Sequence, residues 1–107
     1  MAIRITRGKA DKTIDSIKAA LASYQRDHPS AGIDLYRQNA VSVRVRIVDP
    51  SFTGQNKVER NQRVWQYFDD LPDNVQSDIS MMVLLAPSET TMSMANLEFE
   101  DPVPSKL

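Results

Sequence analysis

Cysteine is absent from this chain, and that absence removes several kinds of chemistry at once. Disulfide bonds, thiolate metal sites and cysteine nucleophiles all need a thiol, so none of them is open to this protein. Glycine is scarce too, and the glycine-rich motifs that bind nucleotide phosphates do not occur. The single histidine, His28, has no nucleophile or carboxylate at a diagnostic spacing. We therefore predict no enzyme activity, no cofactor and no metal site, and only a buried His28 beside a carboxylate would reopen the question.

A strong net charge and long apolar runs are also missing. The formal net charge is -1, so no global field favours binding to nucleic acid or to acidic membranes. No apolar segment approaches the roughly 20 residues of a membrane span. The first residues, MAIRITRGK, lack the apolar core of a secretory signal. We expect a cytoplasmic protein, with no membrane partner and a single domain of 107 residues.

The chain is organised around residues 41–68, which read VSVRVRIVDPSFTGQNKVERNQRVWQYF. The first eight residues alternate apolar and polar side chains, which indicates a half-buried strand. Asp49-Pro50 ends that strand, because proline cannot donate to the ladder. Gly54 supplies a corner, and Asn56 with Glu59 three positions on is typical of a capping box at the start of a helix.

The other elements follow from the same periodicities. Apolar residues at helical spacing predict a first helix at 11–26, capped by Asp11 or Thr13, and a second at 57–71 ended by Pro72, with one more helical turn at 73–77. Alternation predicts a strand at 33–38 that forms a hairpin with the strand at 41–48. The apolar run at 79–86 predicts a central strand covered on both faces, or a strand with one face reserved for a partner.

These elements predict three parts of the chain. Residues 1–10 form an N-terminal arm, although Ile3 and Ile5 alternate as in a short edge strand. Residues 11–89 form an α+β two-layer sandwich: helix, strand, strand, helix, short helix, strand, with a mixed three-stranded sheet and helices on one face. Residues 90–107 form a C-terminal extension. Leu97 and Phe99 make it too apolar for water, so it packs on its own domain or reaches a second subunit. A homodimer through residues 79–107 is one expectation.

One family pattern runs through the loop and second helix. Matching residues stand at its spacing: Phe52, Gly54, Val58, Arg60, Val64 and Trp65. The strand before them ends in Val48-Asp49, and the last strand is followed by Pro87-Ser88-Glu89. In these residues and in the order of its elements, residues 12–89 of the chain resemble the BolA-like family, which has a class II KH-like fold.

The resemblance implies a protein partner and the loss of a cluster ligand. In the family, a histidine shares ligation of a [2Fe-2S] cluster with a monothiol glutaredoxin. Asn61 stands at the position of that histidine, and Gln62 stands at the position of the following arginine. A neutral amide is a poor ligand for such a cluster. We therefore expect a non-enzymatic binding or adaptor domain for a protein partner, glutaredoxin-like by resemblance, with the cluster ligation lost.

Two sets of candidate contact residues follow. The partner-binding set lies on the loop and helix at 52–68: Phe52, Gly54, Lys57, Arg60, Asn61 and Arg63. The alternative is a nucleic-acid-binding set: Arg44, Arg46, Lys57, Arg60 and Arg63. The structural alternatives are ion pairs of these cations with Glu59, Asp69-Asp70 or Asp34. The glycine-x-x-glycine loop of RNA-binding KH modules is absent. Trp65 is expected in the core and Tyr36 on the surface.

Overall fold

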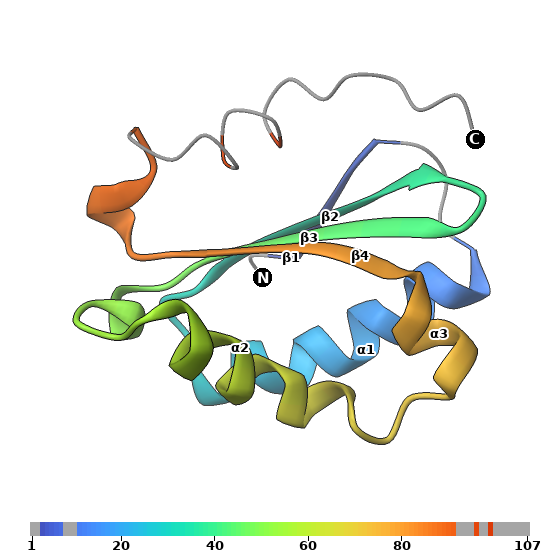
Figure 1. The fold of residues 1–107 in the computed structure, drawn as a ribbon, viewed down its shortest axis with the longest axis horizontal. Coiled ribbons are helices and arrows are strands. Elements are labelled where there is room, and N and C mark those ends of the chain that lie inside the picture. The colour runs from blue at the N-terminus through green and yellow to red at the C-terminus, as the bar shows by residue number, and fades with distance from the viewer. Residues whose placement is uncertain (1–2, 8–10, 92–95, 97–98, 100–107) are drawn as a thin grey trace.

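The computed structural model describes residues 3–7, 11–91, 96 and 99, which form a mixed four-stranded sheet with helices on one face (Figure 1). The elements are β1 (Ile3–Arg7), α1 (Lys12–Asp27), β2 (Gly32–Asn39), β3 (Ser42–Val48), η1 (Pro50–Phe52), α2 (Lys57–Trp65), η2 (Gln66–Phe68), α3 (Asp73–Asp78), β4 (Ile79–Leu85) and η3 (Pro87–Glu89). The strand order is β1-β2-β3-β4. The outer pairs are parallel, and the central pair is antiparallel. The α+β class and the mixed sheet are as predicted.

The prediction of three strands is wrong, because the N-terminal residues supply a fourth. β1 pairs in parallel with β2, placing Ile3 opposite Ile33 and Ile5 opposite Leu35. Ile3 is buried against the core, and Ile5 packs beside it. The alternation of Ile3 and Ile5 was therefore the stronger signal, and it outweighed the tendency of chain ends to stay loose.

The prediction that residues 79–86 form a central strand is also wrong. Among the described residues the sheet order ends at β4, which pairs with β3 alone. Both faces of β4 are nevertheless covered. Leu84 joins the core beneath the helices, and Val83 and Leu85 join Tyr36 and Phe99 on the other face. An apolar run thus indicates that both faces of a strand are covered, but it does not distinguish a central strand from an edge strand.

The main core lies between the sheet and the helix layer. Its fully buried residues come from every layer: Ile14, Leu21, Tyr24, Ile33, Val45, Ile47, Phe52, Val64 and Phe68 among them. Asp11 caps α1 through the Ile14 amide, and Asn56 and Glu59 form the predicted capping box of α2. The second helix is shorter than predicted, because α2 ends at Trp65 and the 3-10 turn η2 continues to Phe68. No helix in the described ranges is long and apolar enough to cross a membrane.

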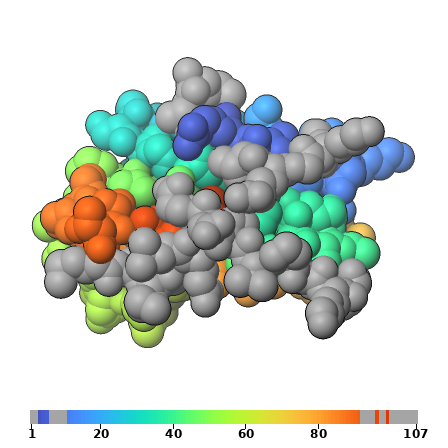
Figure 2. All heavy atoms as spheres, turned by 90° about the horizontal axis from the view of Figure 1, so that it is seen from above, coloured from blue at the N-terminus to red at the C-terminus, as the bar shows by residue number. Residues whose placement is uncertain are grey.

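The second face of the sheet carries a smaller apolar cluster (Figure 2 looks onto this face). Tyr36 is 2% exposed, so its predicted exposure is wrong. Its ring packs edge-on against Phe99 at 5.0 Å between ring centres. Phe99 of the C-terminal extension thus packs on its own domain, one of the two predicted arrangements. Leu97 lies outside the described residues.

Candidate functional site

The loop between β3 and α2 begins at a buried carboxylate. Asp49 is 2% exposed, and its Oδ2 accepts a hydrogen bond from the Tyr24 hydroxyl at 2.6 Å. The Ser51 amide donates to Oδ1 at 2.9 Å. Burial raises the pKa of Asp49, but the bonds from Tyr24 and Ser51 outweigh it and hold that pKa below its usual value. The pKa of Tyr24 is raised, first by burial and then by the bond to Asp49. Asp49 therefore fixes the loop to α1 as a carboxylate.

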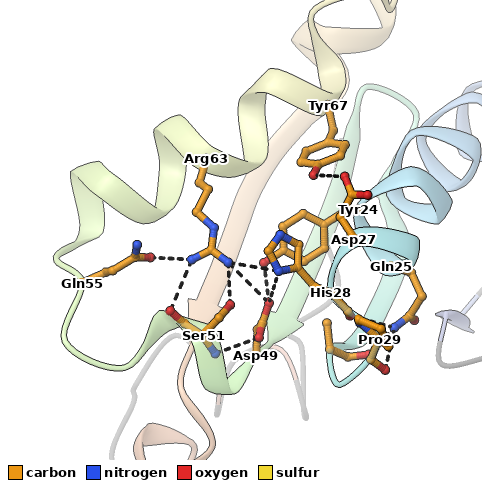
Figure 3. Close-up of polar contacts among 11 residues, drawn as sticks. Tyr24, Gln25, Asp27, His28, Pro29, Asp49, Ser51, Gln55, Arg63 and Tyr67 are labelled. Carbon is orange, nitrogen blue, oxygen red and sulfur yellow. Dashed lines mark hydrogen bonds and ion pairs between the residues drawn. The ribbon is translucent and has the colours of Figure 1, made fainter.

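Arg63 holds the same loop from the side of α2 (Figure 3). Its Nη1 donates to Gln55 Oε1 at 2.8 Å, and its Nη2 donates to Ser51 Oγ. The guanidinium also lies 5.2 Å from the centre of the Phe52 ring. Arg63, predicted to contact a partner or nucleic acid, therefore has both terminal nitrogens bonded to residues of the loop.

His28 lies at the end of α1, beside the same carboxylate. Its ring stacks on Tyr24, and its Nδ1 is 3.8 Å from Asp49 Oδ2. Arg63 Nη2 is closer, at 3.2 Å from Nδ1. Because a guanidinium only donates, this contact is a hydrogen bond when Nδ1 carries no proton. This half-buried His28 beside a carboxylate meets part of the condition for catalysis. However, Nδ1 cannot act as a base toward a substrate without displacing Arg63.

A cavity of about 240 Å³ opens beside this network, lined by Asp27, His28, Pro29, Ser30, Asp49, Pro50 and Ser51. Its walls come from the end of α1 and the start of the β3–α2 loop. Within the part of the chain that the structure describes, no group of three or more histidine or carboxylate side chains is placed to hold a metal ion. The contacts among Tyr24, His28, Asp49 and Arg63 hold the end of α1 against the loop between β3 and α2.

Arg60 joins α2 to the end of β4. The residue is 7% exposed, its Nη1 donates to the Leu84 carbonyl at 2.9 Å, and its Nη2 donates to the Phe52 carbonyl at 3.0 Å. Both nitrogens also bond the Glu89 carboxylate, at 2.7 and 3.0 Å. Glu89 is thus the ion-pair partner, in place of the Glu59 or Asp69-Asp70 considered from the sequence. The candidate contact residue Arg60 is an internal link among α2, the loop and the strand end.

Because Glu89 pairs with Arg60, we expect the free energy of unfolding to fall in acid. The hydrogen bond from Arg60, followed by that from the Ala86 amide, lowers the pKa of Glu89 to about 2. The unfolded chain binds this proton at the ordinary pKa, so it binds more protons between the two values. The contribution of Glu89 to stability is therefore complete above about pH 4.5 and is lost as the pH falls toward 2. Urea unfolding across this range should show a shallower pH slope for Glu89→Gln than for the unaltered chain. An identical slope in both would contradict the link.

A groove runs between α2 and β4. One cavity of about 140 Å³ is lined by Lys57, Arg60, Asn61, Met82, Val83, Leu84 and Leu85. A second of about 200 Å³ is lined by Asn61, Trp65, Ile79, Ser80, Met81 and Met82. The two share Asn61 and Met82, so they follow one another along the strand. Arg60 Nε, in the wall of the first cavity, is a buried donor without a partner among the described residues.

The backbone of β4 faces this groove. The Leu85 carbonyl accepts from the Asp49 amide on the side of β3, whereas the Leu84 carbonyl accepts from Arg60. In a parallel pair, residues whose backbone groups bond the neighbouring strand alternate with residues whose groups point away from it. The N–H and C=O groups of Met82 and Leu84 therefore point to the outer edge of the sheet.

The structure brings only part of the partner-binding set together. Lys57, Arg60 and Asn61 line one cavity, with Lys57 exposed and the Asn61 amide donating to the Lys57 carbonyl. Phe52 is fully buried beneath Arg60 and Arg63. Gly54 makes the loop corner at φ +83°, a backbone conformation that favours glycine. Phe52 and Gly54 thus shape the loop from within.

The nucleic-acid-binding set does not form one surface. Arg46 is 7% exposed, pairs with Asp34, bonds Asn96 at 3.0 Å and lies over the Phe99 ring. The pairing with Asp34 considered from the sequence is confirmed for Arg46. Arg44 bonds the Tyr36 hydroxyl at 3.1 Å. These two arginines lie on the sheet face away from the helices, whereas Lys57, Arg60 and Arg63 lie on α2, across the sheet (Figure 1).

Sequence patterns missed several residues of this region. Local spacing marks Tyr24 only as one of the apolar residues of the predicted first helix, and Asp49 only as the end of a strand. Glu89 was noted only within a family-like turn. Their partners lie 25 and 29 residues away, which no local spacing reveals. Met82 and Trp65 carried a signal as apolar residues, but their place at an open groove depends on the strand order.

Comparisons with models of known protein families, with curated protein sequences and with solved structures find no match to this chain.

Proposed function

We propose that this chain is a non-enzymatic binding module that accepts an extended segment of a protein partner along the groove between α2 and β4. The observation that carries the proposal is the outer edge of β4. The backbone groups of Met82 and the N–H of Leu84 point outward, the Leu84 carbonyl being bonded by Arg60; the strand contains no charged residue, and a groove lies beside it. An extended segment added to such an edge gains main-chain hydrogen bonds, and cavities beside the edge give specificity for alternate side chains.

The groove has the chemistry for such a segment. Its lining combines Met82 and half-buried Trp65 with the polar side chains of Asn61 and Ser80, and methionine adapts its shape to different partners. Arg60 contributes to the wall of the first cavity, so an incoming segment meets a positively charged side chain there. Lys57 adds an exposed positive charge at one end of the groove. We infer that a bound segment is apolar at alternate positions and carries no positive charge near Lys57.

The network behind the groove supports this function by keeping it in place. Asp49 and Arg63 fix the loop before α2, and Arg60 fixes α2 to the end of β4. A site that needs little reordering loses less entropy when a partner binds. Of the partner-binding set, Phe52, Gly54 and Arg63 therefore act by shaping the groove, Lys57 and Asn61 line it, and Arg60 does both.

We also propose that the chain is a divergent member of the BolA-like family. The order α1, β2, β3, α2, α3, β4 supports this, as do the matching residues of the loop and α2. Asn61, at the position of the family histidine, lines both cavities of the groove. A glutaredoxin-like protein is then a candidate partner, bound without cluster ligation by Asn61. A cytoplasmic location belongs to the same proposal.

The proposed groove is tested by blocking it. Short extended peptides from a random library are screened against the chain, and binding is followed by the fluorescence of Trp65, the single tryptophan. Asn61→Arg places a long side chain between the two cavities and should weaken peptide binding about tenfold or more. Ala19→Arg, at an exposed position of α1, is the matched control and should leave it unchanged.

The same samples test the alternative. If mixed RNA or DNA binds instead, and the affinity falls steeply with salt and depends on Arg44, the nucleic-acid function is supported. If Asn61→Arg and the control bind peptides equally well, the groove is not the site.

A further inference from the structure

We propose that a second copy of this chain occupies the groove, and this rests on the proposed function of the groove. The two β4 strands pair antiparallel across a two-fold axis near Met82, and the two α2 helices lie side by side. The four-stranded sheet of each copy then continues into that of the other. Such a two-fold contact is isologous, so the same residues must complement one another on both sides.

The two edges of the sheet differ in a way that indicates pairing at β4. β1 carries two arginines in five residues, and the Arg4 side chain is 70% exposed. β4, with the sequence ISMMVLL, contains no charged residue and no proline. Exposed edge strands are normally protected by charges, proline or bulges, because an unprotected edge recruits other strands. β1 is protected by charge, whereas β4 has the composition of an edge that is covered by another strand.

The exposed side of α2 fits a second copy of itself. α2 runs opposite to β4, because Lys57 lines the groove near Leu85 and Trp65 lines it near Ile79. Val58 is 64% exposed, and the only other exposed large apolar residue among those described is Val41, at 51%. Val58, Asn61, Gln62 and Trp65 follow helical spacing on one side. In an antiparallel pair of α2 helices, Val58 of each copy faces Trp65 of the other.

Charge complementarity favours the same arrangement. Lys57 is exposed at the start of α2, and Asp69 and Asp70 are exposed just after η2. Acidic residues at the end of a helix oppose its dipole, so within one copy they are unfavourably placed. The two-fold axis brings Lys57 and the positive start of α2 of one copy toward Asp69 and Asp70 of the other. A partner of unrelated sequence is not expected to place an opposite charge at both the start of α2 and the residues after η2.

Sedimentation and light scattering over a concentration series measure the association. We expect a monomer–dimer equilibrium. Val58→Glu should raise the dimer Kd about tenfold or more, because it places a carboxylate against Trp65 of the second copy. Val41→Glu is the matched control at the hairpin tip and should leave the Kd unchanged. Circular dichroism checks that both variants fold, as their exposure predicts.

A charge exchange tests the two-fold arrangement itself. Lys57→Glu should weaken the dimer, and Asp69→Lys with Asp70→Lys should weaken it as well. Mixing the two altered chains should restore association, because both ends of a mixed pair bring opposite charges together, whereas each altered chain paired with itself has like charges at both ends. In addition, Gln62→Cys lies near the axis and should cross-link to itself on mild oxidation, in a chain that otherwise has no cysteine. Ala19→Cys on α1 is the control and should not.

Each outcome decides between the two proposals. A chain that stays monomeric up to its solubility limit, with no Gln62→Cys cross-linking, overturns the second-copy proposal. If that monomer still binds peptides and loses them in Asn61→Arg, the groove function stands with a different partner. If it binds none, both proposals fall. A dimer that Val58→Glu and the charge reversals leave unchanged uses another surface and also overturns the proposal.

Discussion

Replacing Arg60 by alanine is expected to lower the free energy of unfolding by about 3 kcal/mol. The guanidinium is buried and satisfies the carbonyls of Leu84 and Phe52. Without it, both carbonyls lose a hydrogen bond, and Glu89 loses its ion pair. Urea unfolding followed by circular dichroism measures the change. The control is Arg26→Ala on α1, an exposed residue that bonds only Ser23 in the described contacts and should change stability by less than about 0.5 kcal/mol.

The Arg60 result bears on function as well as on stability. If Arg60→Ala costs no more than Arg26→Ala, Arg60 is not the internal link described here. The motif position would then need another explanation, such as a direct contact with a partner. If the loss is as large as expected, reduced partner binding by an Arg60 variant cannot by itself be taken as a lost contact. Variants at Asn61 and Val58 are therefore the better reporters of the groove.

Replacing Asp34 by alanine is expected to cost about 4 kcal/mol. Asp34 is 6% exposed and pairs with Arg46, which is 7% exposed and lies over Phe99. Removing the carboxylate takes the negative charge of Asp34 and two hydrogen bonds away from the buried guanidinium. Arg4 pairs with the same carboxylate from solvent, its side chain being 70% exposed, so Arg4→Ala should cost less than about 1 kcal/mol.

A double substitution separates charge from packing at this site. Arg46→Met in the Asp34→Ala chain removes the buried positive charge as well and keeps an apolar side chain near Phe99. It should recover part of the lost stability, because replacing a whole buried ion pair costs less than removing one member. A double variant less stable than Asp34→Ala alone would show that Arg46 stabilises the sheet without needing Asp34.

Local patterns predicted most of the elements of this fold. The alternation at 41–48 predicts β3, Asp11 caps α1, and Asn56 with Glu59 forms the capping box of α2, because each of these signals acts over a few residues. Strand order was not predictable in the same way. Whether the apolar run at 79–86 lies at the centre or at the edge depends on which strands pair, and β1 joins the sheet at the opposite edge.

The candidate site shows the same limit. The motif predicts which residues cluster on the loop and α2, but not which of them face solvent. Phe52 is buried, Arg60 bonds β4 and Glu89, and Arg63 bonds the loop. Lys57 and Asn61 remain at a groove whose other wall comes from β4. That wall had a sequence signal, seven residues without a charge, whose meaning depends on the strand's position at an edge.

Amide hydrogen exchange along β4 tests the central claim most directly. The N–H groups of Val83 and Leu85 point to β3, whereas those of Met82 and Leu84 point to the open edge. If a second copy pairs there, Met82 and Leu84 should exchange fast in dilute solution and become protected as the concentration rises. Val83 and Leu85 should be protected throughout. Fast exchange at Met82 and Leu84 at every concentration, and in the presence of peptides that bind the chain, would contradict strand addition at this edge.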